Sequence, residues 1–373
     1  MKKSTRRNNE PLVSIIILNH NNSWVTLECL EAIRKFTKPK QCEILLIDNG
    51  SRLKEINLLR SVTDRLVKFP IKFIKLNRNQ GFTKPANLGA AIAKGKYLVF
   101  LNNDVIVTPN WLEPLILVFK TDPLAAACGP KLHSYIEKDY FDYSGGAGGF
   151  IDIFGYPFTR GRVFNNIEVD IGQYDDSCEI SWASGSCLVV RACLFRQIGG
   201  FDEYYFAYCE EVDLCFRLRQ KGYKIFYVGE SLVYHWGAVT SNQNLPKKIY
   251  LNHRNHLYFF LKNYSIWPNL PIIMARFFLD LASLFYYLGQ FNLSFVGALI
   301  KADWQVILKV PHLIKKRVLS WHGRSLMSDR TVYKGSIVLK YFIFQQKTFE
   351  QIILGRKRKE TRFKKYNQIT YYR

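Results

Sequence analysis

The chain has 373 residues, of which 48% are hydrophobic and 15% aromatic, and its formal net charge is +23. This length allows one large domain or a domain with an appendage, and this composition excludes a mainly disordered chain. The charge is uneven, because residues 301–373 hold eighteen Lys and Arg against four Asp and Glu. The end of the chain is therefore a basic segment that would attract a polyanion, either a nucleic acid or an anionic membrane surface.

A basic stretch over residues 1–10 precedes an apolar run over residues 12–18. This order superficially matches a signal peptide, but the run is short and reaches Asn19 without a small-residue cleavage site. We therefore interpret residues 12–18 as a first strand. The eight cysteines include no Cys-x-x-Cys pair and several lie in apolar segments, which favours free thiols in a reducing compartment. The sequence thus predicts a cytosol-facing protein.

Strands and helices alternate between residues 12 and 132. The apolar runs predict strands over residues 12–18, 43–47, 71–76, 97–101 and 124–128, with a further short apolar run over residues 105–107. Helices are predicted over residues 24–36, 53–67, 85–94 and 111–120. This alternation predicts an α/β fold with a mostly parallel sheet and right-handed crossovers.

Polar side chains follow four of these strands, namely Asn19, Asp48, Asn79 and Asp104. They would share the edge at which open α/β sheets bind nucleotides. The sequence lacks both Gly-x-Gly-x-x-Gly after the first strand and a P-loop, so a phosphate would need a metal ion rather than a glycine-rich cradle. The alternative for Asn102-Asn103-Asp104 is a simple Asx-type turn after a buried strand.

Residues 133–180 are rich in glycine and aromatic residues and show no clear period. They form either an excursion near a substrate site or a long connection. After a short predicted strand over residues 188–190, a helix over residues 208–222 begins with the acids Glu210, Glu211 and Asp213. Those acids either favour the helix start or serve a site. His235 follows a strand and is either a packed core residue or a ligand.

Eight motifs in order carry a family resemblance. They are Asp48-Asn-Gly-Ser, Asn79-Gln-Gly-Phe82, Asn87-x-Gly89, Leu101-Asn-Asn-Asp-Val105, Gly185-Ser-Cys, Gly199-Gly-Phe-Asp202, Glu210-Glu-Val-Asp-Leu and His235. The chain resembles the family 2 inverting glycosyltransferases over residues 11–265, in particular their bacterial rhamnosyltransferase-like branch.

The resemblance implies a GT-A fold, a nucleotide-sugar donor and a divalent cation, Mg²⁺ or Mn²⁺. Asp104 corresponds to the last acid of the family's Asp-x-Asp metal motif, and His235 is a further candidate ligand. The first position of that motif is Asn102 here, so one charge at the metal is missing. The expected donor-binding residues are Asn19, Asp48, Asn79, Gly81, Phe82, Asn87, Asn102 and Asn103.

The general base of the family aligns with Glu211, and Asp213 is the reserve candidate. Trp182, Ser184, Gly185 and Glu210 are expected to shape the acceptor pocket. The resemblance implies transfer of a sugar from dTDP-rhamnose or a UDP- or GDP-hexose to a hydroxyl of a surface polysaccharide or a lipid-linked glycan. The alternative is a catalytically impaired protein that binds a nucleotide sugar or a polyanion, since Asn102 and Glu211 both depart from the family pattern.

Residues 270–288 are apolar but contain Arg276 and Asp280, one helical turn apart. Charges within a span are unfavourable, so we expect an interfacial helix or a hairpin with residues 291–300. Basic clusters over residues 315–317, 356–359 and 364–365 predict adhesion to the anionic inner face of the plasma membrane. No nucleic-acid partner is expected, because no recognition motif is present.

These patterns together predict three parts. Residues 1–10 form a basic extension, and residues 11–265 form the GT-A domain, divided near residue 132 into nucleotide-sugar and acceptor halves. Residues 266–373 form an apolar and then basic helical region associated with the membrane.

Overall fold

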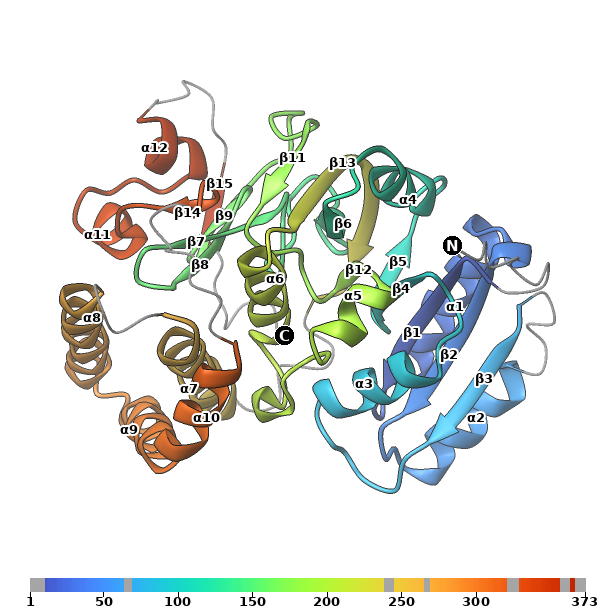
Figure 1. Ribbon diagram of the computed structural model, residues 1–373, viewed down its shortest axis with the longest axis horizontal. Helices are drawn as coiled ribbons and strands as arrows, with labels where there is room; N and C mark the ends of the chain where they lie inside the picture. Colours follow the sequence, from blue (N-terminus) through green and yellow to red (C-terminus); the bar gives the residue numbers. More distant parts are fainter. Residues whose placement is uncertain are drawn as a thin grey trace.

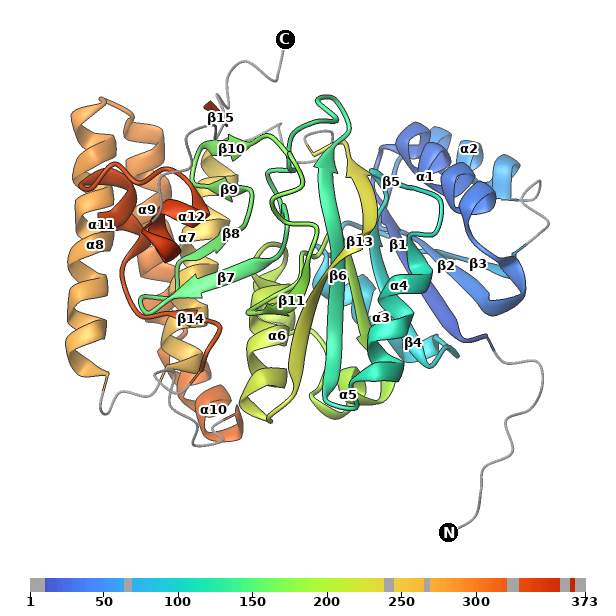
Figure 2. The same ribbon diagram turned by 90° about the horizontal axis from the view of Figure 1, so that it is seen from above.

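The computed structural model describes residues 11–63, 69–237, 245–264, 269–320, 329–355 and 363–365. The predicted extension over residues 1–10 and the basic cluster over residues 356–359 lie outside these ranges. The centre of the molecule is a nine-stranded sheet in the order β11-β13-β6-β12-β4-β1-β2-β3, with β5 paired to β13 (Figures 1 and 2). Its strands are β1 (Val13–Asn19), β2 (Cys42–Asp48), β3 (Ile71–Lys75), β4 (Tyr97–Asn102), β5 (Val105–Val107), β6 (Ala125–Ser134), β11 (Ser177–Ile180), β12 (Cys187–Arg191) and β13 (Lys224–His235).

The sheet has a parallel half and a mixed half. Strands β3, β2, β1 and β4 run parallel, as the alternation of strands and helices predicts. Strand β12 then pairs antiparallel with both β4 and β6, while β6 and β13 are parallel to each other. His235 is the last residue of β13 itself, a long strand with a register shift between Val228 and Leu232.

Two layers of helices cover the two faces of this sheet, because successive side chains of a strand point to opposite faces. Ile15 and Ile17 of β1 pack with α1, α2 and α4, whereas Ile16 packs with α3, α5 and α6. The helices are α1 (Ser23–Phe36), α2 (Leu53–Thr63), α3 (Thr83–Ile92), α4 (Leu112–Thr121), α5 (Ala192–Gln197) and α6 (Glu210–Gln220), with two 3₁₀ turns, η1 (Pro39–Gln41) and η2 (Glu203–Tyr205).

Residues 133–180, which show no period in the sequence, build most of a second, six-stranded sheet. Its order is β14-β7-β8-β9-β10-β15. The strands are β7 (Gly149–Asp152), β8 (Pro157–Thr159), β9 (Arg162–Val163), β10 (Asn166–Glu168), β14 (Val332–Tyr333) and β15 (Phe363–Lys365). The segment is therefore a folded structural element, and the C-terminal region contributes two of its strands.

The C-terminal region is otherwise helical, as expected. Helix α7 (Leu245–Asn263) precedes it, and the region itself contains α8 (Leu270–Gly289), α9 (Leu293–Leu308), α10 (Val310–Ser320), α11 (Ile337–Phe342) and α12 (Phe349–Leu354). Helices α8 and α9 pack side by side at the end of the molecule opposite β3 and α2 (Figures 1 and 2). Arg276 and Asp280 of α8 form an ion pair 2.9 Å long, at the one-turn spacing read from the sequence.

Candidate active site

A cavity of about 930 Å³ lies where strands β1 and β4 end. The walls come from four parts of the chain: the strand ends of the parallel half, the segment that leads into the second sheet, the loop before α6, and helix α7. Residues of α8 and α9 complete the rim. This is the position that open α/β sheets favour for ligands, and it agrees with the position predicted from the polar strand ends.

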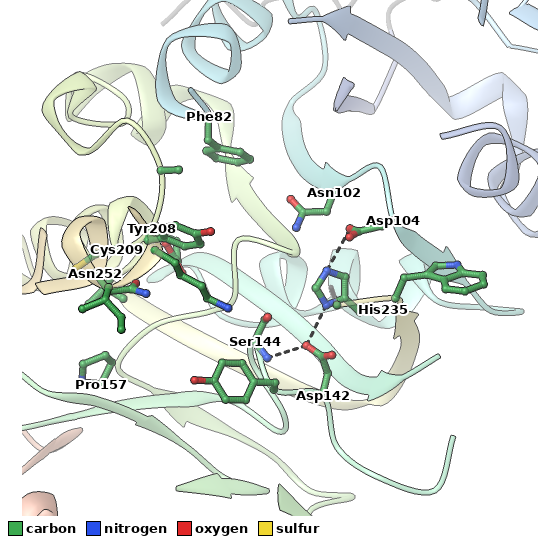
Figure 3. A pocket seen from close by; sticks show the side chains of 18 of the residues that line it. Phe82, Asn102, Asp104, Asp142, Ser144, Pro157, Tyr208, Cys209, His235 and Asn252 are labelled. Carbon is green, nitrogen blue, oxygen red and sulfur yellow. Dashed lines mark hydrogen bonds and ion pairs between the residues drawn. The ribbon is translucent and has the colours of Figure 1, made fainter. Parts of the chain in front are cut away.

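Asp104, His235 and Asp142 form a buried row on one side of the cavity (Figure 3). Strand pairing creates the row, because Val105 of β5 is opposite His235 at the end of β13. His235 Nε2 lies 3.1 Å from Asp104 Oδ1, and His235 Nδ1 lies 3.0 Å from Asp142 Oδ1. Burial lowers the pKa of His235, but the carboxylates of Asp142 and Asp104 outweigh it and raise that pKa well above its usual value.

The contact between Asp104 and His235 is an ion pair between two buried side chains. Asp104 Oδ1 and His235 Nε2 make no other hydrogen bond. Asp142 contacts the other ring nitrogen and so orients the imidazole. A carboxylate oxygen and a ring nitrogen are both donor types that bind divalent cations in proteins, so this pair is the candidate metal site of the cavity. Within the described ranges no group of three or more His, Cys, Asp or Glu is placed to hold a metal.

An amide network builds the opposite end of the cavity. Asn49 Nδ2 donates to Asn79 Oδ1 at 3.2 Å and to the carbonyl of Gly81 at 2.8 Å. Asn19 and Asp48 are neighbours in the β1–β2 register, and Asn19 Nδ2 donates to Asp48 Oδ1 at 3.0 Å. Gly81 has φ +79°, and a Cβ there would lie 2.3 Å from the carbonyl oxygen of Phe206, so only glycine fits.

Glu211 supplies a carboxyl group to the cavity wall at the start of α6. The surrounding protein desolvates this carboxyl and raises the pKa of Glu211 to about 7, while backbone N–H groups, including that of Gly185, partly offset the effect. Its Oε2 atom is buried without a hydrogen-bond partner. Near neutral pH this group can take up or release a proton, which is the property of a general base.

The loop that leads into Glu211 has a strained backbone. Phe206, Tyr208 and Cys209 have φ values of +58°, +71° and +70°. Asn255 of α7 holds the loop, since its Nδ2 donates to the carbonyls of Tyr205, Ala207 and Tyr208 at 3.0, 2.7 and 2.8 Å. Strain of this kind persists only where the surroundings enforce it, and it clusters at functional sites.

The reserve candidate, Asp213, faces the protein core. It is 0% exposed, and its carboxylate contacts Lys262 Nζ at 2.7 Å and Arg217 Nε at 2.7 Å. Burial alone would raise the pKa of Asp213, but these two cations outweigh burial and hold it well below its usual range. Asp213 therefore joins α6 to α7 and is not part of the cavity wall.

Ten of the sixteen predicted site residues line the cavity: Asn19, Asn79, Gly81, Phe82, Asn102, Asn103, Asp104, Trp182, Glu211 and His235. The other six lie behind the wall: Asp48, Asn87, Ser184, Gly185, Glu210 and Asp213. Some of these six support the wall. Asn87 bonds the backbone of Phe201, and Ser184 Oγ donates to the carbonyl of Ser144.

Residues 14–176 match the family model described as glycosyl transferase family 2. This match supports a glycosyltransferase of family 2 over residues 14–176. It is 26% identical over 272 residues to the rhamnosyltransferase WbbL of Escherichia coli, covering 69% of this chain and 96% of that one. It is 38% identical over 93 residues to an N-acetylglucosaminyl-diphospho-decaprenol L-rhamnosyltransferase of Mycobacterium tuberculosis, covering 25% of this chain and 30% of the other.

Another relative, the O-antigen biosynthesis protein RfbC of Myxococcus xanthus, is 27% identical over 245 residues, or 64% of this chain and 18% of that protein. The chain thus spans less than a third of the length of two of these three relatives. Two solved structures have the GT-A fold seen here. The mannosyltransferase PcManGT from Pyrobaculum calidifontis, solved with GDP-Man and Mn²⁺, has a TM-score of 0.51, 13% identity and 83% coverage of both chains. GalNAc-T7, solved with UDP, GalNAc and Mn²⁺, has a TM-score of 0.52, 18% identity and coverage of 72% of this chain and 55% of that one.

Sequence reasoning missed several cavity residues. Asp142, Tyr143 and Arg162 come from the segment without a period, and Lys248 and Asn252 come from α7. Among these residues, only those of the polar, glycine-rich Asp142-Tyr-Ser-Gly-Gly stretch could have been suspected from the sequence. Their pattern does not indicate which strand end they lie beside.

Proposed function

We propose that the chain transfers a sugar from a nucleotide-sugar donor to a hydroxyl group of a glycan acceptor, with inversion at the anomeric carbon. The donor is dTDP-rhamnose or a UDP- or GDP-hexose, and the acceptor is a surface polysaccharide or a lipid-linked glycan. One observation carries the proposal: the Asp104–His235 pair and the Glu211 carboxyl line the same cavity. A seat for a charged leaving group and a base for the attacking hydroxyl are the two parts that such a displacement needs.

Asp104 and His235 are the residues that would hold Mg²⁺ or Mn²⁺, with the donor diphosphate and water as the remaining ligands. The bound ion would offset the negative charge that develops on the departing diphosphate. Asn19, Asn79 and Gly81, at the ends of β1 and β3, would contact the nucleoside part of the donor. The diphosphate would lie at the end of β4 and the nucleoside at the ends of β1 and β3, in the order of these strands in the sheet.

Glu211 would act as the base. As the acceptor oxygen forms its bond to the anomeric carbon, the bond from that carbon to the diphosphate oxygen breaks, and the hydroxyl proton passes to Glu211. A single displacement of this kind inverts the anomeric centre. Asp213 is unsuited to the role, since its oxygens are already engaged by Lys262, Arg217 and Tyr205.

We also propose that the protein attaches to the cytoplasmic face of an anionic membrane through α8 and α9. Met274, Phe277, Phe278 and Phe285 of α8 are 51–61% exposed, and Trp304 of α9 is 59% exposed. Among the described helices, α8 alone is long and apolar enough to cross a bilayer, a test that core helices of soluble proteins also pass. Arg276 supports lying on the surface over spanning, because its guanidinium is buried against Asp280 and the carbonyl of Phe154.

The test is transfer by the purified chain with a panel of nucleotide sugars and Mn²⁺, with and without EDTA. Wild type is expected to transfer or hydrolyse one donor, and EDTA to suppress the reaction. Asp104→Ala and Glu211→Gln are each expected to lower kcat by about a hundredfold or more. Glu113→Gln, at an exposed ion pair outside the cavity, serves as the control. Full activity in the Asp104 or Glu211 variant would refute the residue roles, and donor binding without any turnover would favour the impaired binding protein instead.

A further inference from the structure

Two cations converge on one aromatic ring on the α7 side of the cavity. The guanidinium of Arg162, from β9, lies 4.1 Å from the centroid of the Tyr143 ring, and Lys248 Nζ, from α7, lies 5.5 Å from it. All three residues line the cavity. Lys248 is one helical turn before Asn252, and Figure 3 shows Asn252 across the cavity from Asp104 and His235. The two cations therefore lie on the side of the cavity across from the proposed metal site, where the proposed function assigns no role.

These cations differ from the buried cations elsewhere, which are matched by carboxylates. Lys131 pairs with Asp170, Lys262 with Asp202 and Asp213, Arg217 with Asp213, and Arg276 with Asp280. Arg162 and Lys248 form no such pair with any part of the chain that the structure describes. Arg162 Nε is moreover buried without a hydrogen-bond partner, which is costly unless a ligand satisfies it.

The local field on this side of the cavity is positive. Burial is the largest cause that lowers the pKa of His256 to about 3, and Arg276, His253 and Arg162 lower it further. His256 lines the same cavity and stays neutral there. A guanidinium and an ammonium that lack a carboxylate offer the donors that phosphate groups prefer.

The apolar hairpin of α8 and α9 borders this part of the cavity. Ser283 and Tyr287 of α8 and Leu299 of α9 line it directly. The outer faces of the same helices carry the exposed aromatic side chains described above. An anion bound by the two cations would thus lie beside the helices that provide the most apolar surface of the molecule.

We propose that Arg162 and Lys248 form a second anion subsite, which binds the diphosphate of a lipid-linked acceptor while its hydrocarbon chain runs along α8 and α9. The inference rests on the proposed transferase function and deepens it by naming the class of acceptor. Tyr143 brings the two cations together, since an aromatic face attracts both kinds of cation.

Binding of farnesyl diphosphate to the full chain tests this subsite. Isothermal titration in EDTA removes any metal and requires no catalysis, so the result does not depend on the success of the transfer assay. Farnesol has the same chain without the diphosphate, and inorganic pyrophosphate has the diphosphate without the chain. Arg162→Gln and Lys248→Gln are compared with Lys301→Gln, a control at an exposed lysine on α9 that packs on Tyr250 outside the cavity.

Wild type and Lys301→Gln are expected to bind farnesyl diphosphate equally, and each of the other two variants about tenfold more weakly. Farnesol binding should be the same in all four proteins. Thermal unfolding identifies a variant that fails to fold. If one of the two variants fails, the affinity of the other for farnesyl diphosphate tests the subsite. Unchanged affinity in a folded Arg162 or Lys248 variant would overturn the subsite. If pyrophosphate bound as tightly as farnesyl diphosphate, the hydrocarbon chain would contribute nothing. The proposal of a lipid-linked ligand would then be refuted, and the subsite would be one for a free anion.

Discussion

The acids at the start of α6 are held in different protonation states by their surroundings. Desolvation raises the pKa of Glu211 to about 7, whereas Lys262 and Arg217 keep the pKa of Asp213 well below its usual range. The two acids are two residues apart on one helix. Arg217 is one turn along the same helix, but Lys262 comes from α7, and the spacing in the sequence does not reveal that neighbour.

The raised pKa of Glu211 predicts a pH dependence of transfer. The base must be deprotonated, so its active fraction falls as the pH drops below its folded-state pKa of about 7. We expect kcat/KM to fall about tenfold per pH unit below that value and to level off above it. A pH profile between pH 5 and 9 measures this, with donor affinity followed in parallel to separate base protonation from loss of binding. A flat profile through pH 6 would contradict the role of Glu211.

Asp142 provides a second prediction at this scale. Its carboxylate contacts His235 Nδ1 and leaves Nε2 facing Asp104, so it sets which ring nitrogen is available. Asp142→Asn is expected to weaken Mn²⁺ binding about 10- to 100-fold. Titration of Mn²⁺ followed by electron paramagnetic resonance measures the affinity. Asp139→Asn, at an exposed acid three residues earlier, is the control, and equal Mn²⁺ affinity in the two variants would show that Asp142 does not orient the ligand.

Asp142 and Arg162 also show where prediction from sequence stops. Asp104 and Asn19 follow long apolar strands, so the period of those strands reveals which sheet edge they share. Asp142 reaches the site because His133 and Phe141 form an isolated bridge beside β6, a contact that has no periodic signature. Site residues at the ends of long apolar strands could therefore be predicted from the sequence. Site residues positioned by an isolated bridge or a very short strand could not.

At the scale of elements, the same contrast separates the two sheets. Strands β1, β2 and β4 have six or seven residues and mostly buried side chains, so each appears as an apolar run. Strands β8, β9 and β10 have two or three residues, too few for an alternation to show. Strand β14 joins β7 from about 180 positions later in the chain, a pairing that local patterns cannot contain.

The loop before α6 connects the two halves of the site. The amide N–H of Phe82 donates to the carbonyl of Phe206, so the donor side contacts the loop that positions Glu211. Asn255→Ala would remove the hydrogen bonds that three loop carbonyls accept from the Asn255 side chain. We expect a loss of about 1–3 kcal/mol in the free energy of unfolding together with a lower kcat, because the loop can relax from its strained conformation.

Urea unfolding and steady-state kinetics measure both effects. Asn292→Ala is the matched control: Asn292 caps α9 by accepting from the N–H of Phe295, away from the cavity wall, and its loss is expected to cost about 1 kcal/mol. That control should lose stability but keep kcat. If Asn255→Ala lost stability without any change in kcat, Asn255 would be a structural residue only.

At the scale of the whole molecule, the surface is divided between its two ends. The parallel sheet edge around β3 and α2 is one end, and the apolar hairpin α8–α9 is the other (Figure 2). Residues 301–373 carry most of the net positive charge, and Lys301 of α9 is one helical turn before the exposed Trp304. An apolar face beside positive charge has the composition of a surface that binds anionic lipid.

This arrangement predicts membrane binding that combines apolar and electrostatic contributions. Replacing Phe277 and Phe278 by Ser together removes two side chains that are 61% and 60% exposed. We expect affinity for vesicles of phosphatidylcholine with 30% phosphatidylglycerol to fall at least about tenfold, since burying even part of each ring contributes of the order of 1 kcal/mol. Sedimentation of the protein with the vesicles measures the bound fraction.

The double variant should fold normally, because both rings are exposed and α8 is held to the second sheet by Arg276 through the carbonyl of Phe154. Leu53→Ser, at an exposed apolar residue on α2 at the opposite end, is the control and should bind vesicles like wild type. Raising the salt concentration should weaken binding of both the control and wild type, because salt screens the lysines. If the Leu53 variant lost affinity as much as the double phenylalanine variant, α8 would not be the surface that binds the membrane.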